Sequence, residues 1–152
     1  MLSNKRPPEP WDSIDVIELA PGEAAQIIVA LALRGEPLAR KHLLYTDWVG
    51  VAVVPGNYEE RLIEMFPGAY RHLRLMALHP CDLALSKLER NGQKDRDDVR
   101  FLARTVPLDL EILERRYLTE LRWQLGVPER EDLTLRLWVE MIREDQAAGH
   151  HA

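Results

Sequence analysis

The chain contains very little cysteine: Cys81 is the only one among 152 residues. A single cysteine cannot form a disulfide within the chain, and no group of cysteines and histidines has the spacing of a zinc site. Basic residues are outnumbered as well, with 20 lysines and arginines against 25 aspartates and glutamates, and a formal net charge of -5. These absences exclude a disulfide-stabilised domain and a zinc finger, and they argue against general binding to nucleic acid or anionic membranes.

Long hydrophobic runs are also absent. No apolar stretch approaches the ~20 residues of a membrane-spanning helix, so no membrane partner is expected. The proline-rich start, residues 1–10, has no apolar segment of the signal-peptide kind and is expected to be a flexible lead-in. With 46% hydrophobic and 30% charged residues, the chain has the composition of one globular domain. Together these features predict a cytoplasmic protein.

The first half of the chain alternates between strand and helix patterns. Pro-Gly pairs at 21–22, 55–56 and 67–68 interrupt these patterns. The order predicts an α/β (α+β) fold with a small mixed sheet of about three strands and covering helices. The expected elements are a strand at 14–19, a helix at 24–34, a strand at 43–54, a short helix at 58–66 and a strand at 73–78.

The second half of the chain has helical patterns only, with expected helices at 80–91, 95–105, 108–125 and 128–145. Apolar residues recur at helical spacing in the last two, as in a packed helical hairpin. The expected stripes are Leu110, Leu113, Tyr117 and Leu121 on one helix, and Leu133, Leu137, Met141 and Trp138 on the other. The predicted domains are a lead-in (1–10), an α/β domain (11–106), a helical hairpin packed on it (107–146) and a disordered tail (147–152).

Two carboxylates fall within strand patterns. Asp47 shares an alternating face with Tyr45, Val49 and further apolar residues, and Asp15 lies in the first strand. Burying a charge is costly unless it is paired or used, so these positions are candidates for function. Acids on neighbouring strands commonly hold a divalent ion against a triphosphate, and hard oxygen ligands suit Mg²⁺.

Further charges lie in the helical patterns. Lys87 falls inside the apolar arc of its helix, where it either directs its ammonium to water along a buried stem or points toward a phosphate or carboxylate. Asp95 is in line with the apolar stripe of the next helix, where it either caps the first turn or serves a site. Asp98 lies off that stripe and could pair with a neighbouring arginine, and Asp82 suits the N-terminus of its helix without any further role.

The order of these residues resembles a known family. Asp15 and Asp47, followed by the runs at 82–88 (DLALSKL) and 94–99 (KDRDDV), are similar to DUF6036-type nucleotidyltransferase-like proteins over about residues 11–106. Their superfamily includes toxin–antitoxin components. The resemblance implies that Asp15 and Asp47 hold Mg²⁺ and a nucleoside triphosphate, as the second and third acids of the family's metal site. It also implies later nucleotide-site positions at Lys87, Asp95 and Asp98, with Asp82 beside them.

The chain departs from the family pattern in two places. The first acid of the family's pair falls at Ser13, because Asp12 is an odd number of residues from Asp15 and belongs to the opposite strand face. The family's earlier helix, strand and glycine turn that cradles phosphate have no counterpart before Trp11. The chain is therefore expected to lack the family's first portion and to have an incomplete acid pair.

Three functional hypotheses stay open. In the first, the chain transfers a nucleotide to a hydroxyl acceptor, with RNA open as that acceptor; Asp15 and Asp47 bind Mg²⁺, Lys87 contacts phosphate and Asp95 orients Lys87. In the second, it is a catalytically inactive antitoxin-like or scaffold protein acting through protein contacts, with apolar surface at Trp48, Trp123 and Trp138. In the third, the acids only cap helices and form ion pairs. A missing strand would leave a sheet edge open, which predicts a homodimer or a protein partner.

Overall fold

The computed structural model of the chain describes residues 12–16, 44–48, 53–69, 71 and 74–149. The chain divides into two compact units, residues 1–52 and 53–152, and each is described by itself. The predicted lead-in at 1–10 and the predicted helix at 24–34 lie outside the described residues. The predicted domain boundary after Val106 falls inside the second unit.

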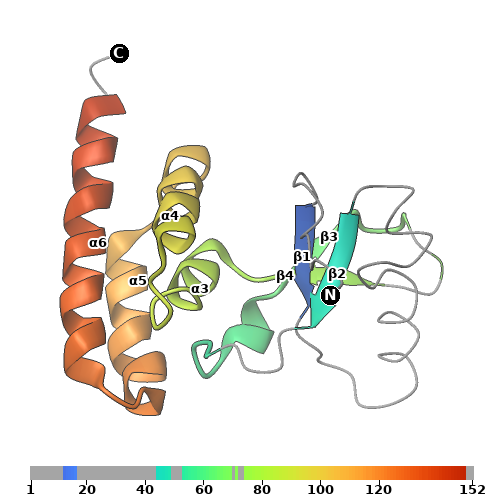
Figure 1. Ribbon diagram of the computed structural model, residues 1–152. Helices are drawn as coiled ribbons and strands as arrows, with labels where there is room; N and C mark the ends of the chain where they lie inside the picture. The colour runs from blue at the N-terminus through green and yellow to red at the C-terminus, as the bar shows by residue number, and fades with distance from the viewer. Residues whose placement is uncertain (1–11, 17–43, 49–52, 70, 72–73, 150–152) are drawn as a thin grey trace, which may run out of the picture. The chain divides into compact units, whose positions relative to one another are not determined.

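The first unit contributes a pair of parallel strands, β1 (Asp12–Val16) and β2 (Leu44–Trp48). Both strands are drawn as neighbouring arrows in Figure 1. The register places Asp15 opposite Asp47. The two acids predicted to lie on neighbouring strands therefore occupy the same level of a parallel pair.

The second unit begins with a short hairpin. A 3₁₀ turn, η1 (Tyr58–Arg61), leads into β3 (Ile63–Met65), which pairs antiparallel with β4 (Leu75–Ala77). The predicted helix at 58–66 is therefore wrong from Leu62 onward, where the backbone turns extended. The alternation of apolar Ile63 and Met65 with Glu64 has the period of a strand, and the Arg74 guanidinium donates to the Glu64 carboxylate from beside the partner strand.

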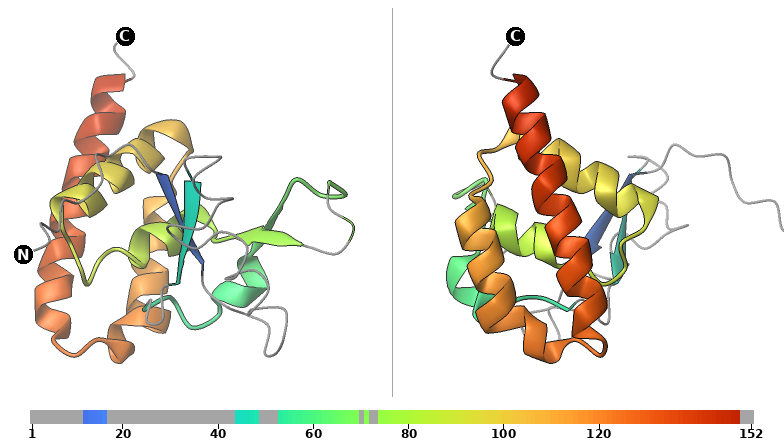
Figure 2. Two further views of the ribbon diagram at one scale, coloured as in Figure 1. Left: turned by 45° about the vertical axis from the view of Figure 1, so that its right-hand side comes forward. Right: turned by 90° about the vertical axis from the view of Figure 1, so that its left-hand side faces the viewer.

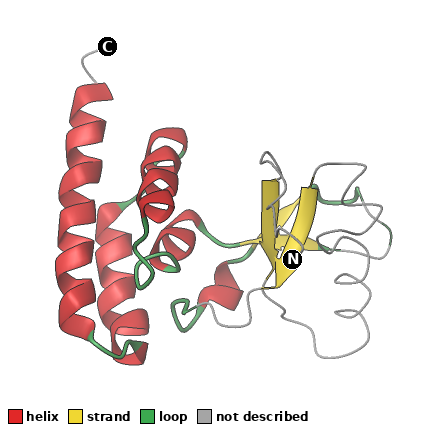
Figure 3. Cartoon of the chain, in the orientation of Figure 1, coloured by secondary structure: helices red, strands yellow, loops and turns green. Residues whose placement is uncertain are grey.

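The strands of the described residues form two separate two-stranded sheets (Figure 3). The mixed α/β class is confirmed, but the single mixed sheet of about three strands is not. The segment of β4 was expected to add a third strand to that sheet. It pairs instead with β3, which lies inside the segment predicted as a helix. Local patterns indicate that a segment is extended, but they do not identify its partner.

Helices make up the rest of the second unit. The α6 helix runs beside α4 and α5 in the different views of Figures 1 and 2, and α3 packs against α4 and α5. In chain order the elements are α3 (Pro80–Leu85), α4 (Gln93–Thr105), α5 (Leu110–Arg116), a π turn η2 (Tyr117–Leu121), a 3₁₀ turn η3 (Arg122–Gln124) and α6 (Pro128–Gly149).

Several helix ends differ from the prediction. The α3 helix stops at Leu85 rather than near Asn91, because the N–H groups of Lys87 and Leu88 donate to carbonyls three residues back and tighten the chain. The α5 helix starts late because the Asp109 side chain caps it by accepting from the Ile112 N–H at 3.0 Å. The α6 helix extends to Gly149, into the tail that was predicted to be disordered.

The hydrophobic core lies between the helices. In the α5–η2 run, Leu113, Tyr117 and Leu121 are fully buried and Leu110 is partly buried against the core, which confirms the predicted stripe. In α6 the predicted stripe is confirmed at Trp138 and, in part, at Met141, but it is wrong at Leu133 and Leu137, which are each 54% exposed. The further apolar residues that α6 buries are Leu135, Val139 and Ile142. The burial of Trp138 agrees with its place in the predicted stripe and contradicts its place in the apolar surface of the second hypothesis, whereas Trp123 is exposed.

None of the helices in the described part of the chain has both the length and the apolar character needed to cross a membrane.

Candidate functional site

The predicted metal ligands lie on the strand pair of the first unit. Asp15 is the Cα partner of Asp47, and Ser13, two residues earlier, is the partner of Tyr45. Neighbouring strands are spaced about 4.8 Å apart, so the backbones of the paired positions lie side by side. Ser13 and Asp15 are alternate residues of β1 and so belong to the same strand face, with Asp12 on the other.

Lys87 is half-buried and its ammonium is engaged. Its Nζ donates to Asp98 Oδ2 at 2.9 Å, and Asp98 lies on α4 and is partly exposed. The sequence analysis gave the role of orienting Lys87 to Asp95, but the carboxylate that binds it is Asp98. Asp98 therefore pairs with a lysine from the turn after α3 and not with the neighbouring arginine that the sequence analysis considered. Lys87 thus has a partly buried stem, as in the first interpretation, and an ammonium that binds a carboxylate, as in the second.

Asp95 is buried and serves the N-terminus of α4. Its Oδ2 accepts from the Gly92 backbone N–H at 2.9 Å, and both of its oxygens accept from the Arg90 guanidinium. These donors hold the pKa of the Asp95 carboxyl below its usual value, chiefly through the Arg90 hydrogen bonds. The capping interpretation of Asp95 is thus confirmed, and Arg90 is the partner that sequence reasoning missed.

The most enclosed charge cluster of the second unit is centred on Asp82. This carboxylate is fully buried and accepts from Arg61 Nε at 2.9 Å, Arg61 Nη2 at 3.2 Å and Arg116 Nη1 at 3.1 Å. The fork of Arg61 also reaches Glu120 Oε2 at 2.7 Å. The charges of two guanidiniums and two carboxylates therefore balance one another. The hydrogen bonds raise the pKa of Arg61 above its ordinary value, and the hydrogen bond to Asp82 is the largest cause.

The Asp82 cluster joins four elements. Arg61 ends η1, Asp82 lies in the first turn of α3, Arg116 ends α5 and Glu120 is in the π turn. The Glu120 carbonyl also accepts from the Gly56 N–H at 3.2 Å, which attaches the segment before the hairpin to the helices. Sequence reasoning placed Asp82 at a helix N-terminus but missed its arginines, because no local pattern links residues 21 and 34 positions apart.

His79 borders this cluster as the N-cap of α3. Its Nδ1 accepts from the Cys81 N–H at 3.2 Å and lies 2.9 Å from Arg116 Nη1, which donates to it. Burial and the neighbouring Arg116 charge lower the pKa of the His79 imidazole. The folded protein therefore favours the neutral ring, with Nδ1 as an acceptor.

We expect acid to weaken the fold through His79. Its pKa is lower in the folded than in the unfolded chain, so the unfolded chain takes up the proton first as pH falls below about 6.5. The contribution of His79 to the free energy of unfolding is complete above that pH and is lost as pH falls toward the folded-state pKa. Urea unfolding of the wild type and of His79→Gln between about pH 7.5 and pH 5.5 measures this loss. An equal decline in the free energy of unfolding of both proteins would contradict the assignment of this loss to His79.

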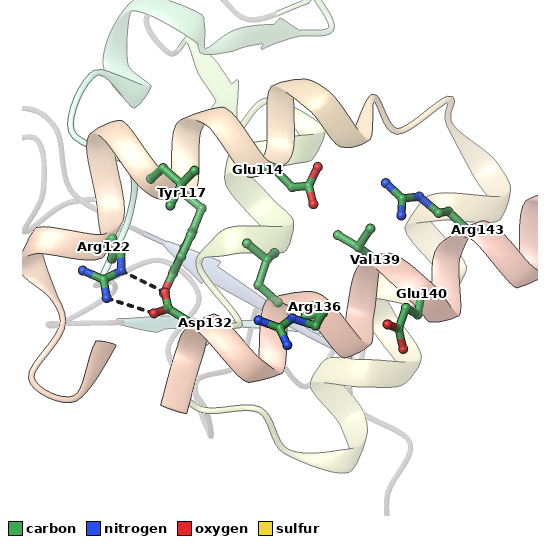
Figure 4. Close-up of a pocket in the computed structure, with 10 residues that line it drawn as sticks. Glu114, Tyr117, Arg122, Asp132, Arg136, Val139, Glu140 and Arg143 are labelled. Carbon is green, nitrogen blue, oxygen red and sulfur yellow. Dashed lines mark hydrogen bonds and ion pairs between the residues drawn. The ribbon is translucent and has the colours of Figure 1, made fainter. Parts of the chain in front are cut away.

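A hollow of about 550 Å³ lies on the outer side of α5, η2 and α6 (Figure 4). At one end Asp132 accepts from the buried Tyr117 hydroxyl at 2.6 Å and from Arg122 Nε and Nη2, both at 2.9 Å. The Arg122 and Tyr117 hydrogen bonds lower the pKa of Asp132 to about 2, and burial is the main reason that the pKa of Tyr117 is raised. Asp132 is thus ionised at any ordinary pH and anchors the π turn to α6.

The described part of the chain contains no group of three or more histidine, cysteine, aspartate or glutamate side chains that could hold a metal ion. Cys81 is buried, and burial is the main cause that raises the pKa of its thiol. That thiol is therefore a poor nucleophile. The residues of the second unit that sequence reasoning proposed for a nucleotide site, Asp82, Lys87, Asp95 and Asp98, all take part in ion pairs within that unit.

Comparison with known proteins identifies the family but not a detailed activity. A comparison with curated proteins gave no significant match, and a comparison with solved structures gave none either. One family model, described as a nucleotidyltransferase of unknown function (DUF6036), matches residues 13–145. The match begins within β1, includes Asp15 and Asp47 and continues to Asp145 in α6. The chain therefore belongs to the DUF6036 family of nucleotidyltransferases of unknown function.

Proposed function

We propose that this nucleotidyltransferase-like chain binds a nucleoside triphosphate together with Mg²⁺ through Asp15 and Asp47, and transfers its nucleoside monophosphate to a hydroxyl acceptor, with RNA among the candidate acceptors. The acceptor oxygen forms a bond to the α-phosphorus, the bond between the α- and β-phosphates breaks, pyrophosphate leaves, and the hydroxyl proton passes to water. The observation that carries the proposal is the parallel register of β1 and β2, in which Asp15 is paired with Asp47. Two acids at one level of neighbouring strands are the arrangement that the family resemblance requires.

The donor set of this strand pair suits Mg²⁺. Carboxylate oxygens are its preferred protein ligands, and the ion commonly uses only one or two of them beside water and substrate phosphates. When bound, the ion would neutralise charge on the phosphates, while Asp15 and Asp47 would hold it in place. Ser13 stands where the family's first acid is expected, so the site has one carboxylate fewer and should bind the ion more weakly.

Titration calorimetry with ATP, GTP, CTP and UTP, each with and without Mg²⁺, tests the proposal. The wild type is expected to bind at least one nucleotide in a Mg²⁺-dependent manner, and Asp15→Asn or Asp47→Asn should weaken that binding at least tenfold, or about 1.4 kcal/mol. Asp12→Asn is the matched control, because Asp12 is on the same strand but belongs to its other face, and it should bind as the wild type does. Ser13→Asp restores the missing carboxylate and should tighten binding.

Absence of binding by the wild type at millimolar nucleotide would contradict the proposal, and so would equal losses in Asp12→Asn and Asp47→Asn.

A second candidate is a catalytically inactive, antitoxin-like or scaffold protein that acts through protein contacts. The observation that favours it is that the expected nucleotide-binding side chains of the second unit are engaged in ion pairs within that unit, Lys87 with Asp98 and Asp95 with Arg90. Under this hypothesis the ion pairs are purely structural. No form of the protein would bind nucleotide, and Lys87→Ala would change only stability.

A further inference from the structure

The exposed side of α6 carries an unused apolar row. Leu133 and Leu137 are one helical turn apart and more than half exposed, although the opposite side of the same helix is fully buried in the core. A helix that packs on one side only normally keeps its outer face polar. The α6 helix is therefore apolar on two faces, of which the described chain covers one.

Beside these leucines runs a stripe of charged residues in strictly alternating order. Asp132, Arg136, Glu140 and Arg143 are spaced by four, four and three residues, so they share one face of the helix. Among the described residues, Arg136, Glu140 and Arg143 form no ion pair. All three are exposed. Asp132 is held by Arg122 but remains partly exposed.

The same four residues line the hollow beside α5. Figure 4 shows Arg136 and Glu140 on α6, with Arg143 farther along the helix and Arg122 bound to Asp132 at the other end. Leu135 and Val139 contribute apolar surface to the hollow, and Leu118, which is 61% exposed, adds to it from the π turn. The hollow thus combines an apolar lining with charges of both signs, as in grooves that receive a helix.

The order of these charges along α6 is complementary to the same order read in the opposite direction. When two copies of α6 lie antiparallel about a two-fold axis, the order minus, plus, minus, plus meets plus, minus, plus, minus. Arg136 of each copy then faces Glu140 of the other, and Asp132 faces Arg143, in one register. A two-fold interface requires this kind of self-complementary surface, in which a contact between two positions is made twice.

We propose that the exposed face of α6 is a homodimer interface, in which the α6 helices of two copies pack antiparallel around Leu137, with mutual Arg136–Glu140 and Asp132–Arg143 pairs. The occupant is a second copy because no other partner is guaranteed to carry the complementary order. This interface is independent of the strand pair and of the proposed nucleotide chemistry. It also places self-association on a helix, whereas the sequence analysis expected it at an open sheet edge.

Charge reversal tests this interface. Sedimentation equilibrium of the full chain from about 1 µM to about 200 µM should show a monomer–dimer equilibrium for the wild type. Arg136→Glu places two acids opposite each other at both symmetric contacts, and Glu140→Arg places two bases there. Each single variant should raise the dimer Kd about 10- to 100-fold. The double variant, Arg136→Glu with Glu140→Arg, restores opposite charges at both contacts and should return the Kd to within a few-fold of the wild type.

Lys94→Glu is the matched control, because it changes the net charge by the same amount at an exposed position of α4 and should leave the Kd unchanged. Circular dichroism of each variant verifies that α6 is still folded. A wild type that stays monomeric throughout would overturn the proposal, since the alternating charges would then be only an intrahelical ladder. A dimer unaffected by either single reversal, or a double variant no better than the singles, would overturn it as well.

Discussion

Replacing Asp82 with alanine is expected to lower the free energy of unfolding by about 3–5 kcal/mol, the usual cost of removing one partner from a buried ion pair. The reason lies in what the change leaves behind. Arg61 and Arg116 are themselves largely enclosed, and each would lose the carboxylate that accepts from its guanidinium. Glu120 could compensate only Arg61, so the Arg116 charge would stand uncompensated beside His79.

Urea unfolding of purified variants measures this loss. Asp98→Ala is the comparison, because it also removes a carboxylate from an ion pair, but one whose members are more exposed. Its cost should stay within about 1 kcal/mol. Asp82→Asn should fall between the two, since an amide oxygen can still accept one guanidinium hydrogen bond. Equal losses in Asp82→Ala and Asp98→Ala would mean that burial does not govern the energetics of this cluster.

The parts of the fold that were predictable are those that local periodicity determines. The stripe through Leu113, Tyr117 and Leu121 repeats at helical spacing and has no competing face, so the buried side of α5 and η2 followed from the sequence. In α6 two apolar faces compete, and the sequence alone did not indicate which one faces the core. The choice depends on the neighbouring elements, among them α4 and η3, against which α6 packs, and the face that carries Trp138 and Ile142 is the buried one.

In the β3–β4 hairpin, local sequence patterns did not show where a helical turn ends and a strand begins. The segment at 58–66 has helical composition at its start and strand alternation at its end, and only pairing with β4 determines where one gives way to the other. A three-residue strand is too short to be evident from its own sequence. Its stability comes from the hydrogen bonds and side chains of the partner strand.

At the candidate site, the sequence predicted the burial of charged side chains more successfully than it predicted their ion-pair partners. The stem of Lys87 is half-buried and Asp95 is buried, as their places on the helical wheel predicted. Their ion pairs, however, are with Asp98 and Arg90, and Asp82 is bound by arginines from two other elements. Partner choice between nearby charges depends on side-chain reach and backbone turns, such as the tight turn after α3, which composition and spacing do not specify.

Replacing Leu113 with alanine should destabilise the fold by about 2–5 kcal/mol, because it removes buried methyl groups and leaves a cavity. Leu113 is fully buried in the core between α5 and its neighbours. Interiors are close-packed, so surrounding side chains can fill the space only in part. The loss should be seen as a lower midpoint in urea unfolding with little change in slope.

Leu118→Ala is the matched control, since it makes the same chemical change five residues away at a largely exposed position of the π turn. Both changes are made in the Arg136→Glu chain, which is expected to be monomeric, so that self-association does not enter the comparison. Leu118→Ala should alter the free energy of unfolding by no more than about 0.5 kcal/mol. If the two substitutions cost the same, Leu113 would not be in the core, and the packing of α5 against the other helices would have to differ from that described.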